Sequence, residues 1–177
     1  MNPTPPSALT TTPATTADIP ALVSFVNSVY RGDSSKQGWT TEADLLDGSR
    51  IDAASLAEML QAQGAVLLMA RTEAGELVGS VYLQQQAETM YLGMLSVNPT
   101  LQGTGIGKYL LHTATDYARQ QECRRLKITV ISVRHELLAW YERHGYRRTG
   151  EELPFHENPA FGTPRQALTL LVLEKPL

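Results

Sequence analysis

A strand, a glycine-rich turn and a helix follow one another in residues 89–121, and this order constrains the fold more than any other feature. The apolar run TMYLGMLSV predicts a strand that ends at Asn98 and Pro99. QGTGIG comes next, and apolar residues spaced by three and four then predict a helix from Gly105 to about Gln121. Glycines let a backbone approach a ligand closely, and a helix N-terminus offers unpaired N–H groups to an anion. The segment is therefore suited to a pyrophosphate, although a glycine-rich turn without a ligand is the commoner structure.

Two known phosphate-binding loops do not fit QGTGIG. A Walker A loop has GxxxxGK followed by Ser or Thr, but here Gly103 and Gly107 are four apart rather than five, and Tyr109 follows Lys108. The dinucleotide fingerprint GxGxxG needs a glycine where Lys108 stands, and it should follow the first strand of its unit. The spacing therefore disfavours a nucleotide-phosphate enzyme of either kind.

The chain as a whole has the composition of one globular domain. It has 177 residues, of which 42% are hydrophobic and 19% are charged. Residues 1–8 are rich in Pro, Thr and Ser and predict a flexible tail, so the domain should cover residues 9–177. Local patterns predict helices at 18–30, 41–47, 53–63, 105–121 and 135–144, and strands at 9–14, 65–70, 77–84, 89–97, 126–131, 146–151 and 167–174.

Charge and cysteine content exclude several classes of protein. The net charge of −3 offers no basic surface to a nucleic-acid backbone. The single Cys123 has no internal disulfide partner, and the spacing of His112, His135, His144 and His156 fits no metal motif. No stretch approaches the length of a membrane span, and the N-terminal residues lack the pattern of a signal peptide. We expect a cytoplasmic protein with no metal and with no nucleic-acid or membrane partner.

Two motifs resemble those of the GNAT superfamily of N-acetyltransferases. The segment LSVNPTLQGTGIGKYLL is similar to the acetyl-CoA motif of that family, in which Gln102, Gly105 and Gly107 match the required positions. The segment AWYERHGY resembles the family's helix-to-strand motif, and a strand separates the two motifs as expected. The resemblance covers about residues 9–175. It implies an α/β (α+β) fold with a central mixed, mostly antiparallel sheet of about seven strands and about four helices. That sheet would be splayed between the fourth and fifth strands to hold acetyl-CoA.

The resemblance also assigns contacts to acetyl-CoA. Backbone N–H groups from Gly103 to Lys108 would hold the pyrophosphate, and the strand residues Leu95 and Val97 would pair with the pantetheine arm. Arg134 stands where many members have an Asn that helps to hold this arm, so the contact is either lost or replaced by an arginine–phosphate contact. The implied cofactor-binding residues are Leu95, Val97, Gln102, Gly103, Thr104, Gly105, Ile106, Gly107, Lys108 and Arg134.

The implied reaction is transfer of the acetyl group to a primary amine of a small molecule or peptide, by direct attack with a tetrahedral intermediate. Tyr141 matches the general acid that donates a proton to the departing CoA thiolate, although packing in the core would also explain an aromatic residue here. Glu88 lies where some members place a carboxylate, and it is the expected general base. Glu42, Tyr91 and His156 are the alternative candidates for this base, and a water chain could replace a dedicated base altogether.

The loop YRGDSSKQGWTTE lies where the resemblance places part of the acceptor site. Trp39 and Glu42 are expected to contact a cationic amine through the ring face and the carboxylate, and Tyr91 is a third expected contact. The sequence selects no particular amine. The resemblance also allows a homodimer, for which no interface is visible. A catalytically silent acyl-CoA-binding or sensing module is the alternative to an enzyme, and the intact glycines and Tyr141 favour the enzyme.

Overall fold

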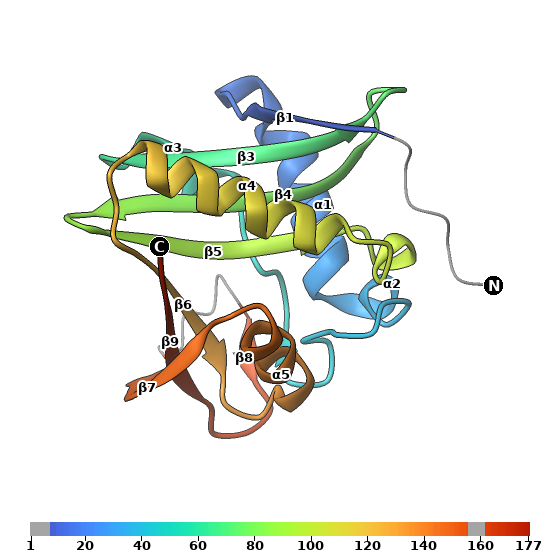
Figure 1. Ribbon diagram of the computed structural model, residues 1–177. Coiled ribbons are helices and arrows are strands. Elements are labelled where there is room, and N and C mark those ends of the chain that lie inside the picture. The colour runs from blue at the N-terminus through green and yellow to red at the C-terminus, as the bar shows by residue number, and fades with distance from the viewer. Residues whose placement is uncertain (1–7, 156–161) are drawn as a thin grey trace.

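The computed structural model describes residues 8–155 and 162–177 and contains one large sheet with helices on both faces (Figure 1). The α-helices are α1 (Ile19–Tyr30), α2 (Gly32–Ser35), α3 (Ala53–Gln61), α4 (Ile106–Gln120) and α5 (His135–Arg143). The strands are β1 (Leu9–Pro13), β2 (Leu46–Asp47), β3 (Ala65–Thr72), β4 (Leu77–Gln86), β5 (Thr89–Val97), β6 (Arg125–Ile131), β7 (Arg147–Pro154), β8 (Thr163–Pro164) and β9 (Thr169–Pro176). Among the described residues, no helix is long and apolar enough to cross a membrane.

The sheet has seven strands in the order β1-β3-β4-β5-β6-β9-β7, and it opens in the middle. Every neighbouring pair is antiparallel except β5 and β6, which run parallel. These two strands pair only where Thr89–Tyr91 meets Arg125–Lys127, and beyond that point they diverge. Figure 1 shows β6 and β9 turning away from β5. The predicted mixed sheet and its splay between the fourth and fifth predicted strands are therefore confirmed.

Helices cover the two faces of the sheet because each carries one apolar stripe. On one face α4 buries Ile106, Leu110 and Ala114, which recur at the helical spacing that predicted this helix. On the other face α1 and α3 bury Leu22, Val26 and Leu56. The sheet therefore has a separate apolar core on each side.

A β-bulge in β5 reverses the direction of its side chains before the strand ends. Gly93 pairs with Tyr82 and Ser96 with Ser80, so Met94 and Leu95 together face one residue of β4. Met94 has a φ of 46°, which is unusual for a residue with a side chain. Upstream of the bulge Leu92 packs on the α4 side, whereas downstream Leu95 and Val97 pack on that side. The extra residue thereby moves these odd-numbered positions onto the α4 face.

The prediction of a helix at residues 41–47 is wrong. The chain forms turns there, and β2 pairs with β8, with Leu46 opposite Pro164. Thr41 accepts a hydrogen bond from the Ala43 N–H at 3.0 Å, which is a local turn rather than a helix cap. Leu46 is buried against Ile131 and Leu168. Pairing and burial with residues distant in sequence thus override the local capping pattern, and the short helix α2 forms instead within the segment predicted as a loop.

Candidate active site

A cavity of about 250 Å³ lies beside the opening in the sheet. Its walls come from β5, the glycine-rich turn and start of α4, the C-terminal end of α1, the loop after α2, and α5. We call it the first cavity. It is lined by Val29, Tyr30, Trp39, Thr40, Leu95, Val97, Gln102, Gly103, Gly105, Gly107, Lys108, Leu137, Trp140 and Tyr141.

The glycine-rich turn exposes backbone to the first cavity. Gly103 and Gly105 have φ values of 83° and 98°, and a Cβ at either position would meet no atom within 4 Å. Glycine is therefore required by the backbone conformation, while the space beside it is open. Gly105 is also the N-cap of α4, whose first turn carries no acidic residue. Unpaired N–H groups and the positive end of the helix dipole make this position favourable for an anion.

The other residues of the predicted cofactor motif have different surroundings. The Gln102 Oε1 accepts a hydrogen bond from the Trp39 N–H at 2.9 Å, so this side chain connects the turn to the loop after α2. The Thr104 hydroxyl donates to the Leu101 carbonyl at 2.6 Å and is used within the turn. Ile106 is 1% exposed and packs in the core. A ligand can therefore contact Ile106 through its backbone alone.

Trp39 lies at the glycine-rich part of the first cavity. It is 44% exposed, and its ring centroid lies 6.2 Å from that of Trp140. A Cβ on Gly107 would approach the Trp140 ring to 3.1 Å. Trp39 and Trp140 therefore form an aromatic wall beside the start of α4. The structure separates Trp39 from Glu42 and Tyr91, with which it was predicted to share the acceptor site.

A second cavity, of about 80 Å³, lies between the diverging parts of β5 and β6. Glu42 and Tyr91 line it, as do Arg50 and Arg134. Four residues line both cavities and therefore mark their junction, namely Tyr30, Leu95, Leu137 and Tyr141.

Tyr141 and Tyr30 are held in their neutral forms at the junction. Tyr141 is 6% exposed and packs edge-on against the rings of Trp140 and Tyr146. Burial raises the pKa of Tyr141 well above its usual value, and the neighbouring Tyr30 adds to the rise. The Tyr30 hydroxyl donates to the Leu95 carbonyl at 2.8 Å, and burial raises the pKa of Tyr30 to about 12. Both phenols therefore keep their protons at neutral pH.

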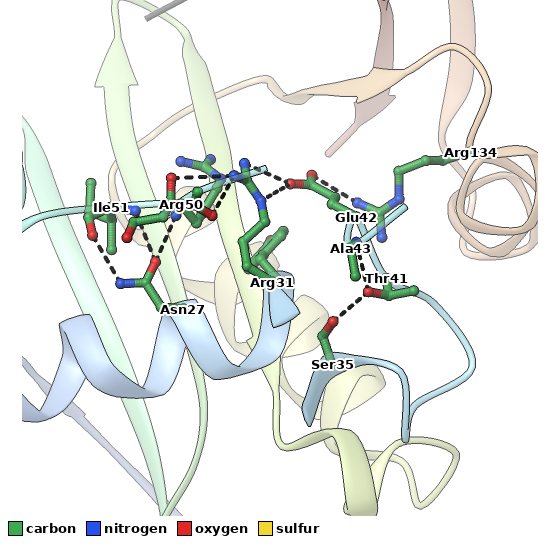
Figure 2. Close-up of polar contacts among 12 residues, drawn as sticks. Asn27, Arg31, Ser35, Thr41, Glu42, Ala43, Arg50, Ile51 and Arg134 are labelled. Atoms are coloured by element: carbon green, nitrogen blue, oxygen red, sulfur yellow. Dashed lines mark hydrogen bonds and ion pairs between the residues drawn. The ribbon is translucent and has the colours of Figure 1, made fainter. Parts of the chain in front are cut away.

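Glu42 lies between two arginines in a buried ion cluster (Figure 2). The Arg31 Nε donates to Oε2 of Glu42 at 3.2 Å, and the Arg134 Nη1 donates to Oε1 at 3.1 Å. Arg134 also donates to the Thr40 hydroxyl at 2.7 Å. All three charged residues are 6–7% exposed. Sequence reasoning missed the role of Arg31, because no local pattern distinguishes it from a solvated arginine.

These contacts determine where the predicted residues Arg134 and Glu42 lie relative to the cavities. Arg134 lines the second cavity and is held by Glu42 and Thr40, so its guanidinium is not directed to the glycine-rich turn. Glu42 lines the same cavity, but each of its oxygens already accepts a hydrogen bond from an arginine.

Glu88, the expected general base, lies apart from the other predicted site residues. It lies in the turn between β4 and β5, pairs with Arg124 at 3.1 Å and has a side chain that is 56% exposed. Leu95 is seven residues further along the same chain segment, which corresponds to roughly 23 Å of extended strand. Glu88 lines neither cavity. His156, an alternative base, lies outside the described residues.

The split sheet, the glycine-rich helix start and the buried tyrosine together define an acetyltransferase type of fold. The chain belongs to the GNAT family, because residues 32–159 match the family model described as an acetyltransferase (GNAT) domain. Among curated proteins no match is found.

Solved acetyltransferase structures share this fold. A putative phosphinothricin N-acetyltransferase superposes with a TM-score of 0.72 at 19% identity, covering 96% of this chain and 99% of the other. The ribosomal-protein-S18-alanine N-acetyltransferase from Escherichia coli gives a TM-score of 0.70 at 15% identity, covering 96% and 94%. A spermidine N-acetyltransferase chimera from Vibrio cholerae and hSSAT gives 0.69 at 15% identity, covering 96% of each chain. At these identities the likeness concerns the fold and does not select an acceptor.

The first cavity fits the acetyl-CoA that proteins of this family generally use. The open space beside Gly103 and Gly105 leaves backbone N–H groups accessible to a diphosphate, and Lys108 adds a positive charge. The β5 edge leading to Val97 is available for an extended arm, because β6 has already diverged from it. Within residues 8–155 and 162–177, no group of three or more His, Cys, Asp or Glu side chains is arranged to hold a metal ion.

Proposed function

We propose that this protein transfers the acetyl group of acetyl-CoA to a primary amine of a small molecule or peptide. The observation that carries the proposal is the junction of the two cavities at Leu95 and Tyr141. A donor in the first cavity and an acceptor in the second would meet there, which brings the reacting atoms together.

The first cavity would hold the donor along its length. Backbone N–H groups at Gly103, Gly105 and the first turn of α4 would bind the diphosphate. The edge of β5 from which β6 has diverged, at Leu95 and Val97, would pair with the pantetheine arm, and the carbonyls of these two residues already accept hydrogen bonds from Tyr30 and Gln102. Trp39 and Trp140 would cover this arm as an apolar wall. Bound acetyl-CoA supplies an activated acetyl thioester.

Tyr141 would act as the general acid. In direct attack the amine nitrogen would bond to the acetyl carbon to give a tetrahedral intermediate. The bond from carbon to sulfur would then break, and the phenol proton of Tyr141 would go to the departing sulfur. The buried phenol of Tyr141 is protonated at neutral pH and can therefore donate this proton. The proton lost by the amine would leave through the second cavity to water, either directly or relayed by Tyr91 as it passes on its own phenol proton, because both Glu42 oxygens are occupied and Glu88 lies far away.

Acetyl-CoA binding is tested by thermal unfolding. At a hundredfold excess over Kd, acetyl-CoA should stabilise the protein by about 2.7 kcal/mol, or raise Tm by roughly 5 to 11 °C. Gly105→Asp should abolish this shift because it places a negative charge beside the diphosphate. Gly75→Asp is the matched control, since Gly75 also has a positive φ and open space around it but lies in the β3–β4 turn. An equal ligand shift in both variants would place the diphosphate elsewhere.

Transfer is tested by measuring CoA release from acetyl-CoA with a panel of amines. Release with at least one amine, and formation of its N-acetyl product, supports the enzyme. A silent acyl-CoA-binding module would instead give the thermal shift with no release from any amine. A cytoplasmic location and a homodimer remain predictions, for which cell fractionation and sedimentation are the measurements.

A further inference from the structure

We propose that the acceptor is an amine that carries a carboxylate close to its reactive nitrogen, with α-amino acids as the simplest members, and that Arg50 binds this carboxylate. The inference rests on the proposed function and specifies its acceptor. It follows from the charge, anchoring and position of the side chains around the second cavity.

The second cavity has an excess of positive charge. Among the described residues that line it, Arg50 and Arg134 are cationic and Glu42 is anionic. Glu42 is shared between Arg134 and Arg31, so its carboxylate is already neutralised from both sides. A polyamine would bring further positive charge to this surface, whereas a carboxylate would complement it.

Arg50 is the guanidinium with capacity for a ligand. Arg134 uses Nη1 and Nη2 on Glu42 and Thr40, so that only its buried Nε lacks a hydrogen-bond partner among the described residues. Arg31 is occupied by Glu42 and by the carbonyls of Gly48 and Ser49. Arg50 instead lies over the ring of Tyr30, with its Cζ 5.4 Å from the ring centroid, and pairs with no carboxylate of the described residues. A planar guanidinium can hold a carboxylate through two parallel hydrogen bonds.

The backbone of Arg50 is fixed in place, which favours recognition over a loose surface contact (Figure 2). The Asn27 Oδ1 accepts hydrogen bonds from the Arg50 N–H at 2.7 Å and from the Ile51 N–H at 3.1 Å. The Asn27 Nδ2 donates to the Ile51 carbonyl at 3.0 Å, and Ile51 is 2% exposed. α1 therefore anchors this segment, so less entropy is lost when Arg50 binds a ligand.

Tyr30 fixes the distance between the guanidinium and the reaction centre. Its ring face carries Arg50, while its hydroxyl bonds to the Leu95 carbonyl at the cavity junction. A carboxylate bound to the Arg50 guanidinium would therefore lie about one tyrosine ring away from the cavity junction at Leu95. The second cavity, of about 80 Å³, is much smaller than the first cavity of about 250 Å³. The amine and carboxylate end of an amino acid fits this space, with its side chain pointing outward.

The test compares acceptors that differ in the carboxylate alone. CoA release is measured with L-amino acids, their carboxamides and the corresponding amines without a carboxyl group, and with spermidine. We expect kcat/KM for the preferred amino acid to exceed that of its carboxamide by about tenfold to a hundredfold, the effect of one charged hydrogen-bonded contact. Arg50→Gln should lower kcat/KM for the amino acid much more than for its carboxamide and so remove most of this difference, whereas Arg50→Lys should keep part of it. The control Arg147→Gln, at an exposed arginine on β7, should change neither rate.

Two results would overturn the inference while leaving the proposed function intact. One is an equal or better rate with carboxamides or spermidine, and the other is an Arg50→Gln variant that lowers all rates equally.

Calorimetry in the presence of CoA measures acceptor binding without turnover. Amino-acid binding that is lost in Arg50→Gln supports the carboxylate site even if no CoA is released, in which case the proposed function fails alone. Absence of both binding and release for every carboxylate-bearing amine contradicts the inference.

Discussion

Tyr141 and Tyr146 are two buried tyrosines in edge-to-face contact, but their hydroxyl groups have different surroundings. Tyr141 lines both cavities, whereas Tyr146 lines neither. The Tyr146 hydroxyl is buried without a hydrogen-bond partner among the described residues. The pair therefore separates the effect of a phenol at the cavity junction from the effect of a phenol in the core.

We predict that Tyr141→Phe lowers kcat by about a hundredfold to ten-thousandfold, the usual contribution of general acid catalysis, with little change in acetyl-CoA affinity. The ring that packs against Trp140 and Tyr146 is retained, so the fold should remain. Steady-state kinetics with an acceptor from the amine panel measures the effect. Tyr146→Phe is the control and should keep the parental kcat, because it removes an unpaired hydroxyl from a residue that lines neither cavity. Equal rates in the two variants would assign Tyr141 a packing role.

At the scale of elements, the segment between α1 and α3 is attached to α5 by the Arg31–Glu42–Arg134 cluster. Thr40 belongs to the same connection, because its hydroxyl donates to Glu136 at 3.0 Å and accepts from Arg134. The cluster joins residues almost a hundred positions apart across the opening of the sheet. It therefore helps to hold the two sides of the second cavity in a fixed arrangement.

We predict that Glu42→Gln lowers the free energy of unfolding by about 3 kcal/mol, because it leaves two buried guanidiniums without their counter-charge. Urea denaturation measures this change. Glu142→Gln is the matched control, since it breaks an exposed pair in which Arg148 Nε lies 2.8 Å from the carboxylate. An exposed pair contributes about 1 kcal/mol or less. Similar small losses in both variants would show that the cluster is not needed for stability.

At the scale of the whole molecule, several tyrosines are buried in the same region around the opening of the sheet. Burial raises the pKa of Tyr30 to about 12 and raises the pKa values of Tyr141 and Tyr146 above their usual range. In the unfolded chain these phenols ionise near pH 10. Above that pH the unfolded state loses protons that the folded state keeps, and unfolding becomes more favourable.

We therefore predict that the tyrosine contribution to the free energy of unfolding is constant up to about pH 9 and decreases as the pH rises above 10. The contribution is fully present below the pKa of the unfolded tyrosines and is lost as the pH approaches the folded values. Denaturant titrations at a series of pH values between 8 and 11 measure the change. The Tyr146→Phe variant should show a smaller decrease. A stability maximum above pH 10 would contradict the prediction.

Local patterns predicted most of the fold because periodicity and capping depend on neighbouring residues. The strand at residues 89–97 and the helix that follows agree with β5 and α4 to within one residue or so at each end. The family motifs led to the split sheet, because QGTGIG and AWYERHGY are each continuous in sequence. The individual roles of the site residues remain predictions. The helix predicted at residues 41–47 does not form, because contacts with the distant β8 and Arg134, rather than neighbouring residues, determine that segment.

The sequence by itself determined the class of fold and the position of the glycine-rich turn, since both depend on short continuous segments. Only the tertiary structure decided which predicted residues meet. It places Trp39 beside Trp140 at the glycine-rich turn, keeps Glu88 at the far end of β5, and couples Glu42 to two arginines. The physical reason is that the bulge in β5, the divergence of β6 and the burial of the ion cluster depend on contacts between distant segments. No local pattern of charge or hydrophobicity specifies such contacts.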